Sequence, residues 1–108
     1  MECTTRSENG FTIIAIIGEV DLHYSPKARE IILKHLGEKN HVLVDLSAVA
    51  YIDSSGVASL VEGFQHARTH GLKFALMGVS EAAMQILQLS RLDKVFPIIT
   101  NITEADQL

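Results

Sequence analysis

Asp53-Ser54-Ser55-Gly56 places a carboxylate and two hydroxyls where an apolar, β-branched run ends and a helical pattern begins. Two kinds of chemistry fit this order. An aspartate or serine here can cap the helix, because its side-chain oxygen accepts hydrogen bonds from the free N–H groups of the first turn. A serine here can also carry a phosphate, since those N–H groups and the helix dipole stabilise an anion. The two interpretations are compatible, and the residues alone leave both open.

Other chemistries fit these four residues poorly. Neither Ser54 nor Ser55 lies in the G-x-S-x-G pattern of a nucleophile elbow, and no histidine stands where a triad would need it. Gly56 lacks a Cβ, so we expect it to leave room for the backbone of a partner. The histidines are expected on solvated surface, in loops or on polar helix faces: His23, His35, His41, His66 and His70.

Nucleotide and metal sites are also unsupported by the sequence. The chain has neither a G-x-x-x-x-G-K-[ST] nor a G-x-G-x-x-G phosphate cradle. Asp21, Asp45 and Asp53 are separated by strands, with no His or Cys at ligand spacing. Asp45 stands near a strand end, like the phosphorylated aspartate of a receiver domain, but the chain has neither the acidic pair nor the lysine that such a domain needs. We therefore expect a structural role for Asp45. Cys3 has no activating neighbour. We therefore expect no enzymatic activity, no cofactor and no metal.

Composition indicates one globular domain over residues 1–108, with 47% hydrophobic and 20% charged residues. The net charge is −4 and the basic residues are scattered, which argues against nucleic-acid binding. No apolar run approaches the ~20 residues of a membrane-spanning helix, and the first residues lack a signal-peptide pattern. We expect a cytoplasmic protein without membrane insertion or a small-molecule substrate.

The first half of the chain predicts a hairpin, a strand and a helix. Asn9-Gly10 is typical of a two-residue type I′ turn. The following strand is expected over 11–17, ending at Gly18. Ser25-Pro26 predicts a helix start with Ser25 as N-cap, and Gly37 is the expected residue just beyond that helix.

The second half alternates strands and helices. Strands are expected over 41–46 and 72–78, with an edge strand over 95–100. A helix is expected from the D-S-S-G turn to Gly71, which closes it, a second helix after Ser80, and a short last helix from Thr103. The order β-β-α-β-α-β-α-β-α predicts a mixed sheet with helices on its faces. In such sheets the carboxyl ends of the strands carry function, which brings residues 18–26 and 53–56 together.

Long segments of the chain resemble the STAS domain, and above all the single-domain anti-sigma-factor antagonists of bacteria. They are G-E-V-D-L-H-Y-S-P-K-A-R-E (18–30), V-L-V-D-L-S-A-V-A-Y-I-D-S-S-G-V-A-S-L (42–60), the run from 76 to 98, and the closing T-E-A-D. The resemblance covers nearly the whole chain. It implies an α/β fold in which about four α-helices flank a mixed β-sheet with an N-terminal hairpin.

The resemblance also implies a function. The unphosphorylated protein would sequester an anti-sigma factor that is a serine kinase, the kinase would phosphorylate Ser55 and be released, and a serine phosphatase would restore the active form. Asp53 would position Ser55, with Ser54 and Gly56 completing the motif. The expected docking face contains Gly18, Glu19, Asp21, Ser25, Val57 and Ser59.

A second function stays open. STAS domains also serve as non-switching adaptor subunits of membrane transport complexes, for example phospholipid ABC transporters. The intact D-S-S-G favours the phosphorylation switch. The chain departs from the family pattern at Val57, where leucine is commoner, and at Arg91, where glycine often follows the third helix. We expect Val57 to pack normally and Arg91 to affect the choice of partner.

Overall fold

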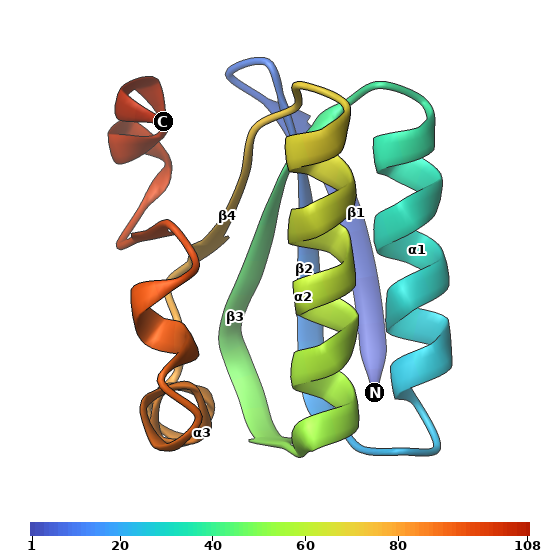
Figure 1. Cartoon of the computed structure of the whole chain (residues 1–108), viewed down its shortest axis with the longest axis vertical. Helices are drawn as coiled ribbons and strands as arrows, with labels where there is room; N and C mark the ends of the chain where they lie inside the picture. The colour runs from blue at the N-terminus through green and yellow to red at the C-terminus, as the bar shows by residue number, and fades with distance from the viewer.

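The computed structural model describes all residues from Met1 to Leu108 (Figure 1). Its strands are β1 (Glu2–Glu8), β2 (Phe11–Val20), β3 (His41–Ile52), β4 (Phe74–Met77) and β5 (Ile98–Ile99). Its α-helices are α1 (Ser25–Gly37), α2 (Ser54–Thr69) and α3 (Glu81–Leu89), and the 3₁₀ helices are η1 (Leu92–Lys94) and η2 (Ile102–Gln107). No helix has the length and apolar character needed to cross a membrane.

The strands form one mixed sheet in the order β1-β2-β3-β4-β5. β1 pairs antiparallel with β2, and all other neighbouring strands are parallel. The predicted hairpin turn is confirmed, because Asn9 and Gly10 both have positive φ, 52° and 81°. The short strand β5 lies at the edge of the sheet and directly follows Pro97. Proline has no N–H to donate to a neighbouring strand, so it is tolerated at such an edge. The predicted mixed α/β fold is therefore confirmed.

The three α-helices cover one face of the sheet. Their buried side chains pack with those of β2, β3 and β4 in one core of 19 buried residues, which includes Ile14, Ile32, Val44, Leu60 and Leu87. Figure 1 shows α1 and α2 side by side in front of the strands. The opposite face has a smaller cluster around Ile13, Leu43 and Ala105, and η2 is the helix that contributes to it. The predicted last helix is thus present, but as a 3₁₀ helix.

The strand β2 is longer than its sequence pattern predicts. Gly18 does not end it: with φ of 97°, this glycine sits at a register shift between Gly18 and Glu19, and pairing with β3 continues to Val20. A glycine in the left-handed region permits such a bulge without steric cost. The extension pairs Val20 with Ile52, one residue before the D-S-S-G turn.

The start of α1 also differs from the prediction. Tyr24 is the N-cap residue and makes no side-chain capping bond, while Ser25 is already helical and buried. Asp21 takes over the role, since its Oδ1 accepts from the N–H groups of His23 at 3.0 Å and Tyr24 at 3.2 Å. Its backbone oxygen accepts from Tyr24 and Ser25 as well. The expectation of Ser25 as N-cap was wrong because Asp21 orders the turn before it.

The two helix ends expected at glycines behave differently. Gly71, beyond α2, has φ of 68° and occupies the left-handed position as predicted. Gly37 is still helical, and the left-handed residue after α1 is Lys39, with φ of 65°. A side chain with a Cβ costs roughly 1–2 kcal/mol in that conformation. The expectation for Gly37 was therefore wrong by two residues, and the chain retains backbone strain at Lys39.

Relieving this strain should stabilise the fold. Lys39→Gly should raise the free energy of unfolding by about 0.5–1 kcal/mol, because the steric gain exceeds the extra entropy of the unfolded chain. Lys34→Gly, at an exposed position in the last turn of α1, is the control and should lower the free energy of unfolding by about 0.5–1 kcal/mol. Urea denaturation followed by circular dichroism measures both changes, and a loss of stability in Lys39→Gly would contradict the strain argument.

Candidate functional site

Asp53 organises the turn between β3 and α2. It is the N-cap of α2, and one carboxylate oxygen, Oδ1, accepts from the N–H groups of Ser55 at 2.9 Å and Gly56 at 3.2 Å. The same oxygen accepts the hydroxyl of Ser55 at 2.5 Å. The capping interpretation of the motif is therefore confirmed for Asp53, and Ser55 lies in the first turn of the helix as expected.

These donors favour the charged carboxylate. The hydroxyl of Ser55 is the largest influence that lowers the pKa of Asp53 below its ordinary value. Partial desolvation opposes the shift, while the backbone N–H groups of Gly56, Ser55 and Leu22 reinforce it. Asp53 is consequently an anion at neutral pH, and it directs the hydrogen of the Ser55 hydroxyl toward itself.

The two serines have different surroundings. Ser54 is exposed, and its hydroxyl makes no hydrogen bond within the chain. Ser55 is half-buried, with its hydroxyl held by Asp53. The structure thus orients one serine oxygen, that of Ser55, and leaves the other free to rotate.

The loop before α1 lies beside this turn, as the strand order predicted. The N–H of Asp53 donates to the carbonyl oxygen of Val20 at 3.2 Å. The hydroxyl of Ser59 donates to the carbonyl oxygens of Ser25 at 3.1 Å and Ser55 at 3.2 Å, which ties α1 to α2. In Figure 1 both segments lie at the lower end of the molecule.

Three of the residues expected on the docking face are buried. Ser25, Val57 and Ser59 are each only 5% exposed, and the hydroxyl of Ser59 donates to the backbone carbonyl oxygen of Ser25. This bond between the helices explains the polar side chain of Ser59. Glu19 is exposed, while Gly18 and Asp21 are half-buried, so these three residues remain on or near the surface.

Gly56 does not leave room for a partner backbone. It is buried, and a Cβ at this position would lie 2.8 Å from the carbonyl oxygen of Val20 and 2.7 Å from Cγ1 of Ile52. The absent side chain is required by close packing within the chain: α2 starts directly against β2 and β3. The expectation for Gly56 was wrong because the chain's own strands fill the space.

Three exposed apolar side chains near the turn were not predicted from the sequence. Leu22 is 74% exposed, Tyr51 is 50% exposed and Tyr24 is 37% exposed. Tyr24 lies edge-on against His23, with ring centroids 4.7 Å apart. A loop of mixed polarity gives no periodic signal, so only the structure shows that these side chains are exposed. Leu22 lies next to the D-S-S-G turn, because its backbone N–H bonds to Asp53, and Tyr51 precedes the turn by two residues. Exposed apolar side chains grouped around a polar site are typical of a protein-binding surface.

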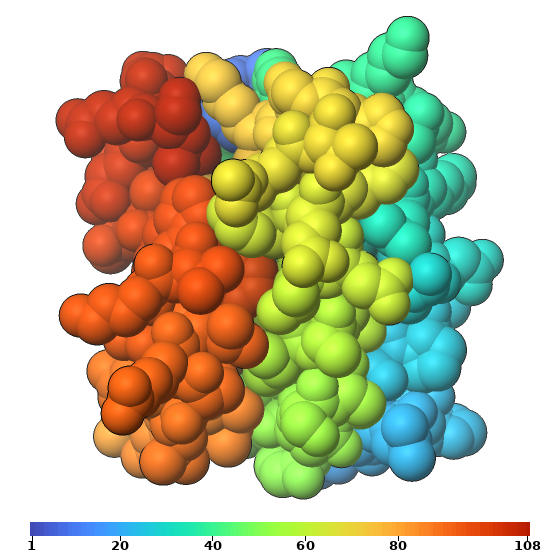
Figure 2. Space-filling model, viewed as in Figure 1, coloured from blue at the N-terminus to red at the C-terminus, as the bar shows by residue number.

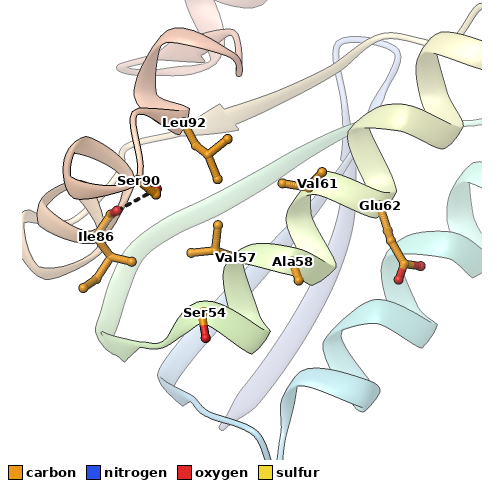
Figure 3. Close-up of a pocket in the computed structure, with 8 residues that line it drawn as sticks. All are labelled: Ser54, Val57, Ala58, Val61, Glu62, Ile86, Ser90 and Leu92. Carbon is orange, nitrogen blue, oxygen red and sulfur yellow. Dashed lines mark hydrogen bonds between the residues drawn. The ribbon is translucent and has the colours of Figure 1, made fainter.

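An apolar groove of about 480 Å³ runs between α2 and the α3–η1 segment. In Figure 3, Val57 and Val61 of α2 point toward Ile86 and Leu92 on the other side, while Glu62 points toward α1. Ser54 lines one end of the groove, so it adjoins the D-S-S-G turn. In Figure 2 the groove follows the border between the yellow-green surface of α2 and the orange surface of α3 and η1. Val57 is 5% exposed and contributes to the groove wall.

The remaining candidate residues lie away from this end of the molecule or have structural roles. Asp45 accepts from the N–H of Ser47 at 2.9 Å, in keeping with its expected structural role. His35, His41 and His66 are half-buried, so these three histidines are less solvated than predicted. The ring of His41 accepts from the N–H of Lys73 at 3.0 Å. Burial raises the pKa of the Cys3 thiol. No three His, Cys, Asp or Glu side chains cluster in a way that could hold a metal ion.

The geometry has counterparts among known proteins. The family model for the STAS domain matches residues 2–105. The chain belongs to the STAS domain family. The anti-sigma-B factor antagonist of Listeria monocytogenes is 28% identical over 86 residues, which cover 79% of this chain and 75% of that protein.

Solved STAS structures share the fold. An anti-sigma factor antagonist from Mycobacterium paratuberculosis superimposes with a TM-score of 0.84 at 22% identity, over 98% of this chain and 91% of that one. The Bacillus cell fate determinant SpoIIAA in its phosphorylated form superimposes with a TM-score of 0.74 at 17% identity, over 98% and 97% of the two chains. The STAS fold predicted from the motifs is thus confirmed.

The capping role of Asp53 can be measured. Asp53→Ala should lower the free energy of unfolding by about 1 kcal/mol at pH 7, whereas Asp53→Asn should retain most of it, because asparagine caps equally well. The pKa of Asp53 is lowered in the folded state, so the charged form stabilises the fold above the unfolded pKa and this contribution is lost as pH falls. The wild-type advantage over Asp53→Asn should therefore shrink below about pH 4. A pH-independent difference would contradict the assignment.

Proposed function

We propose that this STAS protein is an anti-sigma-factor antagonist whose binding is switched by phosphorylation of Ser55. The observation that carries the proposal is the bond from the Ser55 hydroxyl to the Asp53 carboxylate at the start of α2. Membership of a family whose matched relatives are anti-sigma factor antagonists supports the same function. The protein would act in the cytoplasm, as a binding switch without catalysis of its own.

Ser55 is the proposed acceptor because its oxygen is already oriented. A partner serine kinase supplies ATP, the Ser55 oxygen forms a bond to the γ-phosphorus, and the bond to ADP breaks. The hydroxyl proton passes to the carboxylate that already accepts it, or to solvent. Ser54 has no such acceptor for its proton. A serine phosphatase hydrolyses the phosphoserine and returns the original state.

The phosphate adds about −1.5 to −2 charge at pH 7 next to the Asp53 carboxylate. It also competes with that carboxylate for the N–H groups of Ser55 and Gly56. The helix N-terminus stabilises the new anion within the chain. A partner packed on this turn has to accommodate a bulky dianion in place of a small hydroxyl, which costs several kcal/mol when it cannot be solvated. Release then follows from conflict at the surface, without refolding of the domain.

The proposed docking face is smaller than the sequence predicted. It includes Gly18, Glu19 and Asp21 on the β2 end and loop, the exposed side of the D-S-S-G turn, and the neighbouring side chains of Leu22 and Tyr24. Ser25 and Ser59 support this face from beneath, because they hold α1 against α2. Partners of this face are an anti-sigma factor with kinase activity and a serine phosphatase.

Phosphorylation can be tested directly. Incubation with ATP and the partner anti-sigma factor should place phosphate on Ser55, as read by phosphopeptide mass spectrometry, and lower partner affinity at least about 100-fold, or about 2.7 kcal/mol. Amide NMR shifts should change mainly over residues 53–60. Phosphate on Ser54, or labelling without a kinase, would contradict the proposal. Unchanged affinity after modification would assign the protein to the adaptor class.

Single substitutions separate the charge of Ser55 from its hydroxyl. Ser55→Asp should weaken partner binding because it brings a second carboxylate to the turn, whereas Ser55→Ala should bind and resist release. Asp21→Asn, which can still accept the N–H groups of His23 and Tyr24, should also weaken binding. His66→Ala, toward the other end of α2, is the control and should bind normally. Isothermal titration calorimetry measures all four, and equal losses would place the face elsewhere.

A further inference from the structure

Arg91 occupies a strained position at the edge of the apolar groove. Its φ of 61° and ψ of 18° lie in the left-handed region, where a residue with a Cβ is disfavoured. Its N–H donates to the carbonyl oxygen of Gln88 at 3.1 Å, a bond that glycine would make equally well. The backbone therefore gives no reason for an arginine here.

The side chain of Arg91 has no role within the chain either. It is exposed and has no carboxylate within 4.0 Å, although Asp93 is only two residues away. Both sequence neighbours, Ser90 and Leu92, line the groove. Lys39 has the same backbone conformation and also makes no ion pair, so strain alone does not mark a binding site. Arg91 differs from Lys39 in its place, between two residues that line the apolar groove.

The charges around the groove define what would fit it. The carboxylate of Glu62, on the α1 side, is already paired with Arg29 at 2.5 Å. Asp93 and Lys94 follow Arg91 on η1 with opposite charges, and Arg91 makes no ion pair with any carboxylate of the chain. The groove wall itself is apolar, formed by Val57, Ala58, Val61, Ile86 and Leu92. Arg91 is thus a cation without an ion-pair partner at the η1 edge, in a chain whose net charge is −4.

We infer that this groove binds an apolar segment of the anti-sigma factor that carries an aspartate or glutamate, and that Arg91 selects this partner by pairing with the acidic side chain. The inference rests on the proposed function and adds a second anchor beside the phosphorylation site, since Ser54 belongs to both surfaces. The apolar side chains supply affinity, and the charge of Arg91 at the edge supplies discrimination.

Arg91→Gly gives the sharpest test, because it should change stability and binding in opposite directions. The melting temperature should rise as the strain is relieved, while affinity for the anti-sigma factor should fall about tenfold. Lys39→Gly is the matched control: it relieves the same strain at the far end of α1 and should leave affinity unchanged. Arg91→Lys should keep most of the affinity, and Arg91→Glu should lose about 100-fold.

The probe is the recombinant anti-sigma factor that binds the unmodified chain, measured by calorimetry at two salt concentrations. Ala58→Arg, which fills the groove from an exposed position on α2, should also abolish binding. Reversing the partner's acidic residue to lysine should restore binding to Arg91→Glu. Unchanged affinity in both Arg91→Gly and Ala58→Arg would overturn the inference.

Two further outcomes separate this inference from the proposed function. If Ser55→Asp weakens binding but the Arg91 and Ala58 variants do not, the groove assignment fails and the switch stands. If Ser55→Asp binds normally, the proposed function itself fails. Sedimentation analysis of the chain alone tests whether a second copy of the chain occupies the groove. Self-association that Ala58→Arg abolishes would overturn the assignment to an anti-sigma factor.

Discussion

One carboxylate oxygen of Asp53 accepts two backbone N–H groups and the hydroxyl of Ser55, and the geometry of the whole functional end depends on it. These bonds fix where α2 begins, and therefore which face of the helix each later residue occupies. They also keep the carboxylate charged and the serine oriented. The same oxygen atom of Asp53 therefore caps the helix and orients the hydroxyl of Ser55.

Packing beneath the turn makes this geometry rigid. Gly56 lies so close to Val20 and Ile52 that even one extra carbon atom would collide with the backbone. The Ser59 hydroxyl bonds across to α1 from the buried side of α2. With its first turn fixed from below and by Asp53 from above, α2 has little freedom to shift. A change in charge at its start is therefore expressed at the surface rather than in the core.

The sequence predicted the architecture well because its strongest signals are local. Asn9-Gly10, the buried runs and the Ser80 cap each specify one element, and their order determines the sheet. It failed where a tertiary contact decides the role of a residue. Ser25 and Ser59 resemble surface hydroxyls until the packing of α1 on α2 is known, and Gly56 resembles a flexible turn residue until β2 is placed. The apolar groove joins segments about 30 residues apart, so no local pattern contains it.

The strand order has a consequence for what this fold can hold. Each crossover places the next parallel strand on the same side of the last, so the sheet grows in one direction without reversing. In open α/β sheets, the crevice that encloses a small ligand forms where neighbouring crossovers run in opposite directions. Here the loops after β2, β3 and β4 all lead to helices on the same face of the sheet, and no such reversal lies between them. The side chains of these loops are therefore arranged along one edge of the sheet, an arrangement that suits contact with the surface of a protein partner.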